Sequence, residues 1–175
     1  MRAALAVVLI AAALTACSRE NQTGAPRETP PGVLKIKEIM RDQIEPNAQI
    51  YWHSSGTVDT AKGTIDLAPT TEEGWKKAEA SVDAVLAGAQ MLKEPVRARD
   101  KGDWMKHADK LIEQAQLSKA AVQKRDKDAM FMTGGDLYAV CSGCHQQYLL
   151  PYLGADGRPK KLDENGTPIS NPLGK

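Results

Sequence analysis

The stretch Cys141-Ser142-Gly143-Cys144-His145 decides how the fold of this 175-residue chain is interpreted. Two cysteines separated by two residues and followed at once by a histidine form the C-x-x-C-H pattern of covalent haem c attachment. Both thiols can add to the vinyl groups of one porphyrin, and the imidazole after the second cysteine can then ligate the iron. The spacing therefore predicts one covalent haem c, held by Cys141 and Cys144, with His145 as an axial ligand.

Three other interpretations of the two cysteines are open. A redox-active C-x-x-C pair normally follows a strand in a βαβ unit, and a zinc site would need two further Cys or His ligands at suitable spacing. Buried structural cysteines are the third, since free cysteines are common in protein cores. Haem attachment is favoured because an export signal and a helical context agree with it.

The haem motif lies in a block with the periodicity of an amphipathic helix, from about Lys127 to Leu149. Apolar positions recur every three or four residues, so the two cysteines fall on the inward face. Gly134 and Gly135 weaken this helix, and they predict either a local bend or the close approach of a neighbouring segment. The inward positions are Met130, Gly134, Leu137, Cys141, Cys144 and Tyr148.

Three more blocks with helical periodicity precede this one, at about residues 33–54, 71–93 and 103–125. The inward positions of the first are Val33, Ile36, Met40 and Ile44. Those of the second are Trp75, Ala78, Val82, Val85, Ala89 and Leu92, and those of the third are Trp104, Ala108, Leu111, Ala115, Ser118 and Val122. Short links between the later blocks predict antiparallel neighbours.

Proline and threonine residues predict where these helices bend, begin and end. Pro46 interrupts the first block, so a kink or a restart of the helix is expected there, with Glu45 outside the α region. Thr70 or Thr71 can cap the second helix, and Pro95 stops it. No strand alternation is visible in the long connection over residues 55–69. The chain is therefore expected to be all-α, an antiparallel four-helix bundle with the haem bound near its C-terminal helix.

The N-terminal residues have the pattern of an export signal. Met1-Arg2 is a short positive region, and the apolar run Ala3–Leu14 is too short to span a bilayer, which needs about 20 residues. Leu14-Thr15-Ala16-Cys17 resembles the lipobox of bacterial lipoproteins, which implies cleavage after residue 16 and a lipid on Cys17. Ordinary signal cleavage, leaving Cys17 as a free thiol, is the alternative. Lipidation predicts a periplasm-facing protein on a membrane, with Ser18 favouring the outer membrane.

Composition and charge limit the remaining organisation and the partners. The polar, turn-rich residues 17–32 are expected to form a flexible tether, residues 33–149 the haem domain, and residues 150–175 an irregular tail. The formal net charge is +1, and the chain has a single Phe and no long basic run. Nucleic acid is therefore not expected as a partner, and membrane contact is expected only through the lipid on Cys17.

The segment Gly134–Tyr148, with the ending Cys-x-x-Cys-His-x-x-aromatic, resembles the class II c-type cytochromes, the cytochrome c′ group. Gly102-Asp103-Trp104-Met105 and Ile39-Met40-Arg41 are similar to other helices of that group, and the resemblance extends over about residues 33–149. The tail beyond the motif is longer than is typical there. Leu149 stands where many five-coordinate members have an Arg.

The resemblance implies a function that depends on the second axial ligand. A residue of the first helix faces the distal side of the haem in that group, and low-spin members use a Met there. Met40 is at that place, which implies His145/Met40 ligation and a one-electron carrier that is not an enzyme. Met40 as a core-filling residue, with a vacant site that binds nitric oxide or carbon monoxide, is the alternative. An accessory subunit of a larger complex is a third reading, with the tail as its interaction segment. A redox partner protein and a homodimer are further implications.

Overall fold

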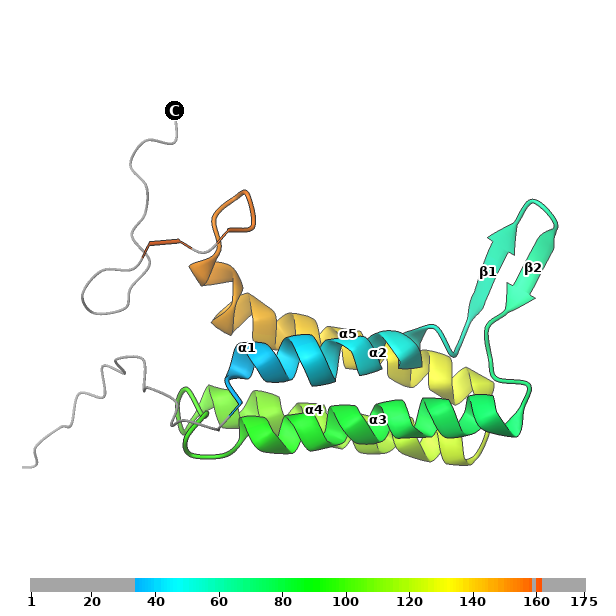
Figure 1. Cartoon of the computed structure of the whole chain (residues 1–175), viewed down its shortest axis with the longest axis horizontal. Helices are drawn as coiled ribbons and strands as arrows, with labels where there is room; N and C mark the ends of the chain where they lie inside the picture. The colour runs from blue at the N-terminus through cyan, green and yellow to red at the C-terminus, as the bar shows by residue number, and fades with distance from the viewer. Residues whose placement is uncertain (1–33, 159, 162–175) are drawn as a thin grey trace, which may run out of the picture.

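The computed structural model describes residues 34–158, 160 and 161, which form a mostly helical bundle with one small sheet (Figure 1). The predicted signal peptide, Cys17, the tether, Val33 and most of the tail lie outside the described residues. The three long helices are α3 (Glu72–Leu92), α4 (Asp103–Gln123) and α5 (Lys127–Tyr148). They confirm the last three predicted helices.

Capping side chains set where α3 and α5 begin. Thr71 has extended backbone, and its Oγ1 accepts a hydrogen bond of 3.1 Å from the N–H of Gly74, so the predicted cap of α3 is confirmed. Asp126 caps α5 in the same way through the N–H of Ala129, at 3.0 Å. Between α4 and α5 the chain reverses within a few residues, helped by Arg125 at a φ of 53°.

The first predicted helix is continuous but has three parts, which are α1 (Ile36–Ile39), the π-helical turn η1 (Met40–Ile44) and α2 (Glu45–Trp52). The expectation that Glu45 leaves the α region is wrong, because its φ is −58° and its ψ is −53°. Pro46 has no N–H to donate to the preceding turn. The wider π turn accommodates it, since the N–H of Glu45 bonds to the carbonyl of Met40, five residues earlier.

A two-stranded antiparallel sheet lies between α2 and α3 and projects from the bundle (Figure 1). It consists of β1 (Thr57–Thr60) and β2 (Gly63–Asp66), and its register pairs Thr57 with Asp66 and Thr60 with Gly63. The expectation of a chain without strands is therefore wrong for this segment. Every residue of both strands is exposed, so neither strand carries the alternation that a half-buried strand would show.

Helices α3, α4 and α5 pack against one another in sequence order, and α2 lies against α3. The predicted inward face of α4 is confirmed, because all of its positions are buried. The inward face of α3 is buried as predicted except for Trp75, which is half-buried. Trp104, 4% exposed, donates its Nε1–H to the carbonyl of Leu92 at 2.7 Å and ties α4 to the end of α3.

Helices α2 and α5 meet at one end only. Tyr51 shares a hydrogen bond of 2.7 Å with Thr133, and the Nε1–H of Trp52 donates to the carbonyl of Gly134 at 2.9 Å. The close approach predicted at Gly134 is confirmed, because a Cβ there would lie 3.4 Å from Cδ1 of Trp52. Beyond this contact α5 diverges from α1 (Figure 1). Few residues of α5 touch the first helical segment, which consists of α1, η1 and α2.

The described part of the tail begins with structure that was not predicted. Leu150–Tyr152 form the 3₁₀ turn η2, and the N–H of Lys160 donates to the carbonyl of Tyr152 at 2.8 Å. Across residues 34–158, 160 and 161, no helix combines the length and the apolar character that crossing a membrane requires.

Candidate functional site

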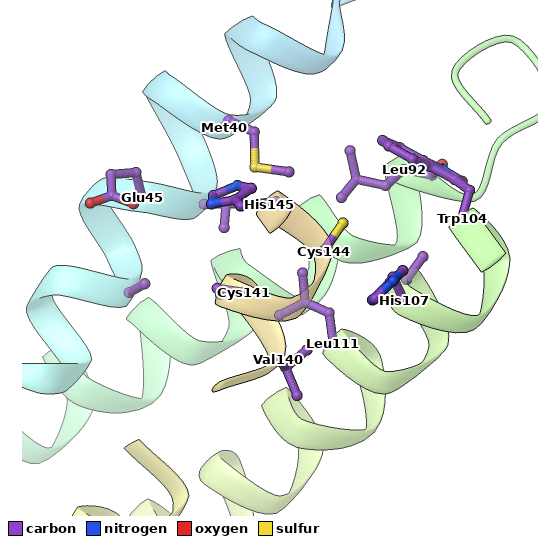
Figure 2. Close-up of a pocket in the computed structure, with 13 residues that line it drawn as sticks. Met40, Glu45, Leu92, Trp104, His107, Leu111, Val140, Cys141, Cys144 and His145 are labelled. Carbon is purple, nitrogen blue, oxygen red and sulfur yellow. The ribbon is translucent and has the colours of Figure 1, made fainter. Parts of the chain in front are cut away.

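An apolar pocket lies where α5 diverges from the first helical segment (Figure 2). The space between its walls is about 550 Å³, which includes its opening to solvent. Met40, Cys141, Cys144 and His145, the four predicted haem-binding residues of the described chain, all line this pocket. Most of the other wall residues are apolar, and these are Ile44, Ala48, Leu92, Trp104, Ala108, Leu111 and Val140.

Cys141 and Cys144 are one helical turn apart on α5, so both present a thiol to the same face. Both are half-buried and neither is in a disulfide. Burial raises the pKa of Cys141 to about 11, with a smaller contribution from Glu45, and burial also raises the pKa of Cys144. Redox-active C-x-x-C pairs have the opposite property, a lowered thiol pKa.

His145 follows Cys144 on the same helix and is half-buried in the pocket wall. The helix continues past it, because the N–H of Leu149 donates to the carbonyl of His145 at 2.9 Å. The imidazole is therefore carried on a regular helical backbone beside the two thiols. Figure 2 shows the imidazole among the side chains that line the pocket.

Met40 reaches the pocket from the first residue of the π turn, and its side chain is half-buried (Figure 2). Two neighbours fix the backbone around it. Ile39 is fully buried in the core, and Ile44 packs so closely on α3 that a Cβ at Gly88 would lie 2.5 Å from its Cγ1. Gln43 adds a hydrogen bond of 3.0 Å to the carbonyl of Ala84. The thioether is thus held on a defined stretch of backbone across the pocket from α5.

His107 and Glu45 also line the pocket, and neither was predicted to do so from the sequence. His107 faces the haem motif, since its Cε1 lies 3.9 Å from where a Cβ of Gly143 would be. Its Nε2 lies 3.0 Å from Oε1 of Gln147, and its ring meets Tyr148 edge to face at 5.9 Å. The sequence signal for His107 was its place one turn from Trp104 and Leu111 on the inward face of α4.

Tyr148 packs against two residues of the pocket wall, Trp104 and His107, and makes a polar contact to the α3–α4 connection. Its hydroxyl donates to the carboxylate of Asp100, and its ring packs edge to face on Trp104 at 5.0 Å. Burial and this acidic partner raise the pKa of Tyr148, so the phenol keeps its proton. The inward position predicted for Tyr148 corresponds to a half-buried side chain at this boundary.

The remaining histidine and the other methionines of the described residues do not line the pocket. His53 is exposed, Met132 is 63% exposed, and Met130 is buried in the core beside Tyr51. Met91 and Met105 pack partly buried against the core. Within the part of the chain that the structure describes, no three His, Cys, Asp or Glu side chains are grouped as a metal site would require.

Comparisons with protein-family models, with curated proteins and with solved structures found no match to this chain. The chemistry of the pocket residues is therefore the basis on which a function can be proposed.

Proposed function

We propose that this protein is a periplasm-facing monohaem c-type cytochrome, tethered to a membrane, that carries single electrons and transforms no substrate. One observation carries the proposal. A single apolar pocket collects the two thiols and the imidazole of the C-x-x-C-H motif together with the thioether of Met40, which comes from a segment about a hundred residues earlier.

The donor set fits haem c. The two thiols are free and half-buried and lie on one helical face, so both can add to the vinyl groups of one porphyrin. An imidazole and a thioether are both suitable axial ligands of haem iron. The walls are mostly apolar, which matches a porphyrin plane and keeps the local dielectric low.

Each residue has a distinct role in this proposal. Cys141 and Cys144 would hold the porphyrin, His145 would bind the iron as proximal ligand, and Met40 would bind it from the other side. The haem would supply the one-electron redox chemistry when bound. Ile44, Ala48 and Leu111 would exclude water from its faces. With both axial positions filled, electron exchange requires little rearrangement of ligands.

The proposal includes the cellular location of the protein and its partner proteins. A lipid on Cys17 would anchor the chain in the periplasm, on the outer membrane rather than the inner. The electron would pass to or from a separate redox protein. The lipobox-like sequence Leu14-Thr15-Ala16-Cys17 supports the lipid anchor, whereas the resemblance to the cytochrome c′ group supports the redox partner and a homodimer.

Covalent attachment is tested by replacing both cysteines, Cys141→Ala with Cys144→Ala, in cells that carry the bacterial apparatus for haem attachment. Haem staining after denaturing electrophoresis should show a band for the wild type and none for the double variant. A stained band that persists in the double variant would refute the assignment of the two cysteines.

The second ligand is tested by Met40→Leu, with Met91→Leu as a matched control, since Met91 is also partly buried but does not line the pocket. The oxidised wild type should be low-spin with a weak charge-transfer band at the red end of the spectrum. Met40→Leu should lose the band, turn high-spin, bind carbon monoxide and have a lower reduction potential, because a thioether favours ferrous iron. A wild-type protein that is already high-spin and binds carbon monoxide readily would instead support a diatomic gas binder.

A further inference from the structure

Arg97 stands out because a charged side chain is buried there. It lies in the connection between α3 and α4, and its side chain is 6% exposed. Among the residues that the structure describes, it is the one buried side chain that carries a permanent charge. A guanidinium in such a place is costly unless its donors are satisfied.

The partners of Arg97 connect two distant parts of the chain. Its Nη1 donates to the carbonyl of Met91 at 3.3 Å and forms an ion pair with Glu94, both within or beside its own connection. Its Nε donates to the carbonyl of Leu34 at 2.9 Å, a residue 63 positions away in sequence. Leu34 directly precedes Lys35, the N-cap residue of α1.

We propose that Arg97 is a positioning residue that holds the start of the Met40-bearing helix and thereby keeps the thioether over the iron. This inference rests on the His145/Met40 ligation proposed above. Met40 lies between two anchors, with the Arg97 hydrogen bond before it and the contact of Ile44 with Gly88 after it. Removing the first anchor leaves the helix start held mainly by the burial of Ile39.

The anchor is important because α1 is the exposed first turn of a continuous helical segment that runs through η1 into α2. The first turn of a helix frays easily, because its first N–H groups have no partner within the helix. The N–H of Lys35 is bonded to the carboxylate of Glu38 at 2.8 Å, but this bond is local and does not attach α1 to the bundle. Loss of a hydrogen bond from a charged donor should raise the open fraction of this segment by roughly 10- to 100-fold.

The test compares Arg97→Met with Arg99→Met in the full-length protein carrying its haem. Methionine keeps most of the side-chain length but donates no hydrogen bond, and Arg99 is an exposed arginine in the same connection. Hydrogen exchange of the amides of residues 36–44 is measured together with the oxidised optical spectrum and carbon monoxide binding. Arg97→Met should speed exchange by roughly 10- to 100-fold, weaken the methionine band and bind carbon monoxide faster, whereas Arg99→Met should match the wild type.

The results distinguish a failure of the ligation proposal from a failure of the inference about Arg97. A wild-type spectrum without the methionine band refutes the ligation proposal itself. A wild-type band that persists in full strength in Arg97→Met overturns the inference about Arg97 alone. If Arg97→Met does not fold, Arg97→Lys is used, which keeps the charge but lacks the forked donors that reach Leu34 and Glu94 together. Its band should be weaker than that of the wild type, and wild-type exchange and spectrum in this variant overturn the inference.

Discussion

A methyl group added at Gly88 probes the contact that places the π turn on α3. The new Cβ would lie 2.5 Å from Cγ1 and 3.0 Å from Cδ1 of Ile44, far inside the normal contact distance of two carbon atoms. Ile44 is 4% exposed, and its β-branched side chain has few other rotamers. Since Cγ1 is not the tip of the side chain, the backbone of η1 or of α3 has to move.

Two opposing terms set the size of the effect. Replacing Gly by Ala inside a helix ordinarily stabilises it by about 1 kcal/mol, whereas overpacking a core costs about 1–3 kcal/mol. Gly88→Ala should therefore lower the free energy of unfolding by about 1 kcal/mol. Gly135→Ala is the matched control, because Gly135 is also inside a long helix but no atom lies within 4 Å of its added Cβ. It should raise that free energy by about 0.5–1 kcal/mol.

Urea denaturation followed by far-ultraviolet circular dichroism measures the difference between the two variants. With equal slopes, their free energies of unfolding should differ by roughly 2 kcal/mol. If Gly88→Ala is as stable as Gly135→Ala, the two segments do not approach as closely as described, and the placement of Met40 derived from that contact is wrong.

Three further perturbations test other contacts and the proposed anchor. Trp52→Phe removes the 2.9 Å hydrogen bond to the carbonyl of Gly134 that closes α2 on α5, and should destabilise the protein by about 1–2 kcal/mol in the same urea assay; an unchanged midpoint would contradict this role. Although partial burial raises it, hydrogen bonds from Tyr148 and from the N–H groups of Gly102 and Trp104 bring the pKa of Asp100 below its ordinary 3.8. The ionised Asp100 carboxylate therefore stabilises the folded protein at pH values above 3.8. This contribution is lost as the pH falls through the lowered pKa. Asp100→Asn should remove the part of the loss of stability that sets in as the pH falls below 3.8, and an unaltered acid profile would show that the carboxylate has no such role. Cys17→Ser should release the protein from membranes on cell fractionation, because the proposed lipid would be lost; wild-type protein found wholly in the soluble periplasmic fraction would refute lipidation.

The three long helices were predictable because each has a regular apolar face, and α3 has clear end signals as well. Thr71 and the steps from Ala78 to Leu92 show this for α3. The strands of residues 57–66 were not predictable, because all their side chains are exposed and burial leaves no pattern in them. Pro46 correctly indicated irregular backbone, but the sequence does not distinguish a kink from a π turn, since both preserve the inward direction of Met40 and Ile44.

The pocket could be anticipated to the extent that its residues lie on inward helix faces or in the haem motif. The places of Cys141, Cys144 and Met40 follow from such positions. His107 was missed because its exposure to the pocket depends on how α4 meets α5 at Gly143. Arg97 gave no signal at all, since its distant partner is a backbone carbonyl, which any residue at position 34 would provide.

Tyr51 and Trp52 hold α2 against α5 through hydrogen bonds. A change in the angle between the two helices would therefore pivot at this contact. From Gly134 to His145 the lever arm along α5 is roughly 16 Å, at 1.5 Å per residue. A change of about 5° in the crossing angle would therefore move His145 by about 1.4 Å. The contact of Tyr51 and Trp52 with α5 would stay almost in place. A change in pocket width through this angle would leave the contacts of the first half of α5 intact, and it would be opposed by the contacts of Tyr148 with Asp100 and of Gln147 with His107 at the far end of the helix.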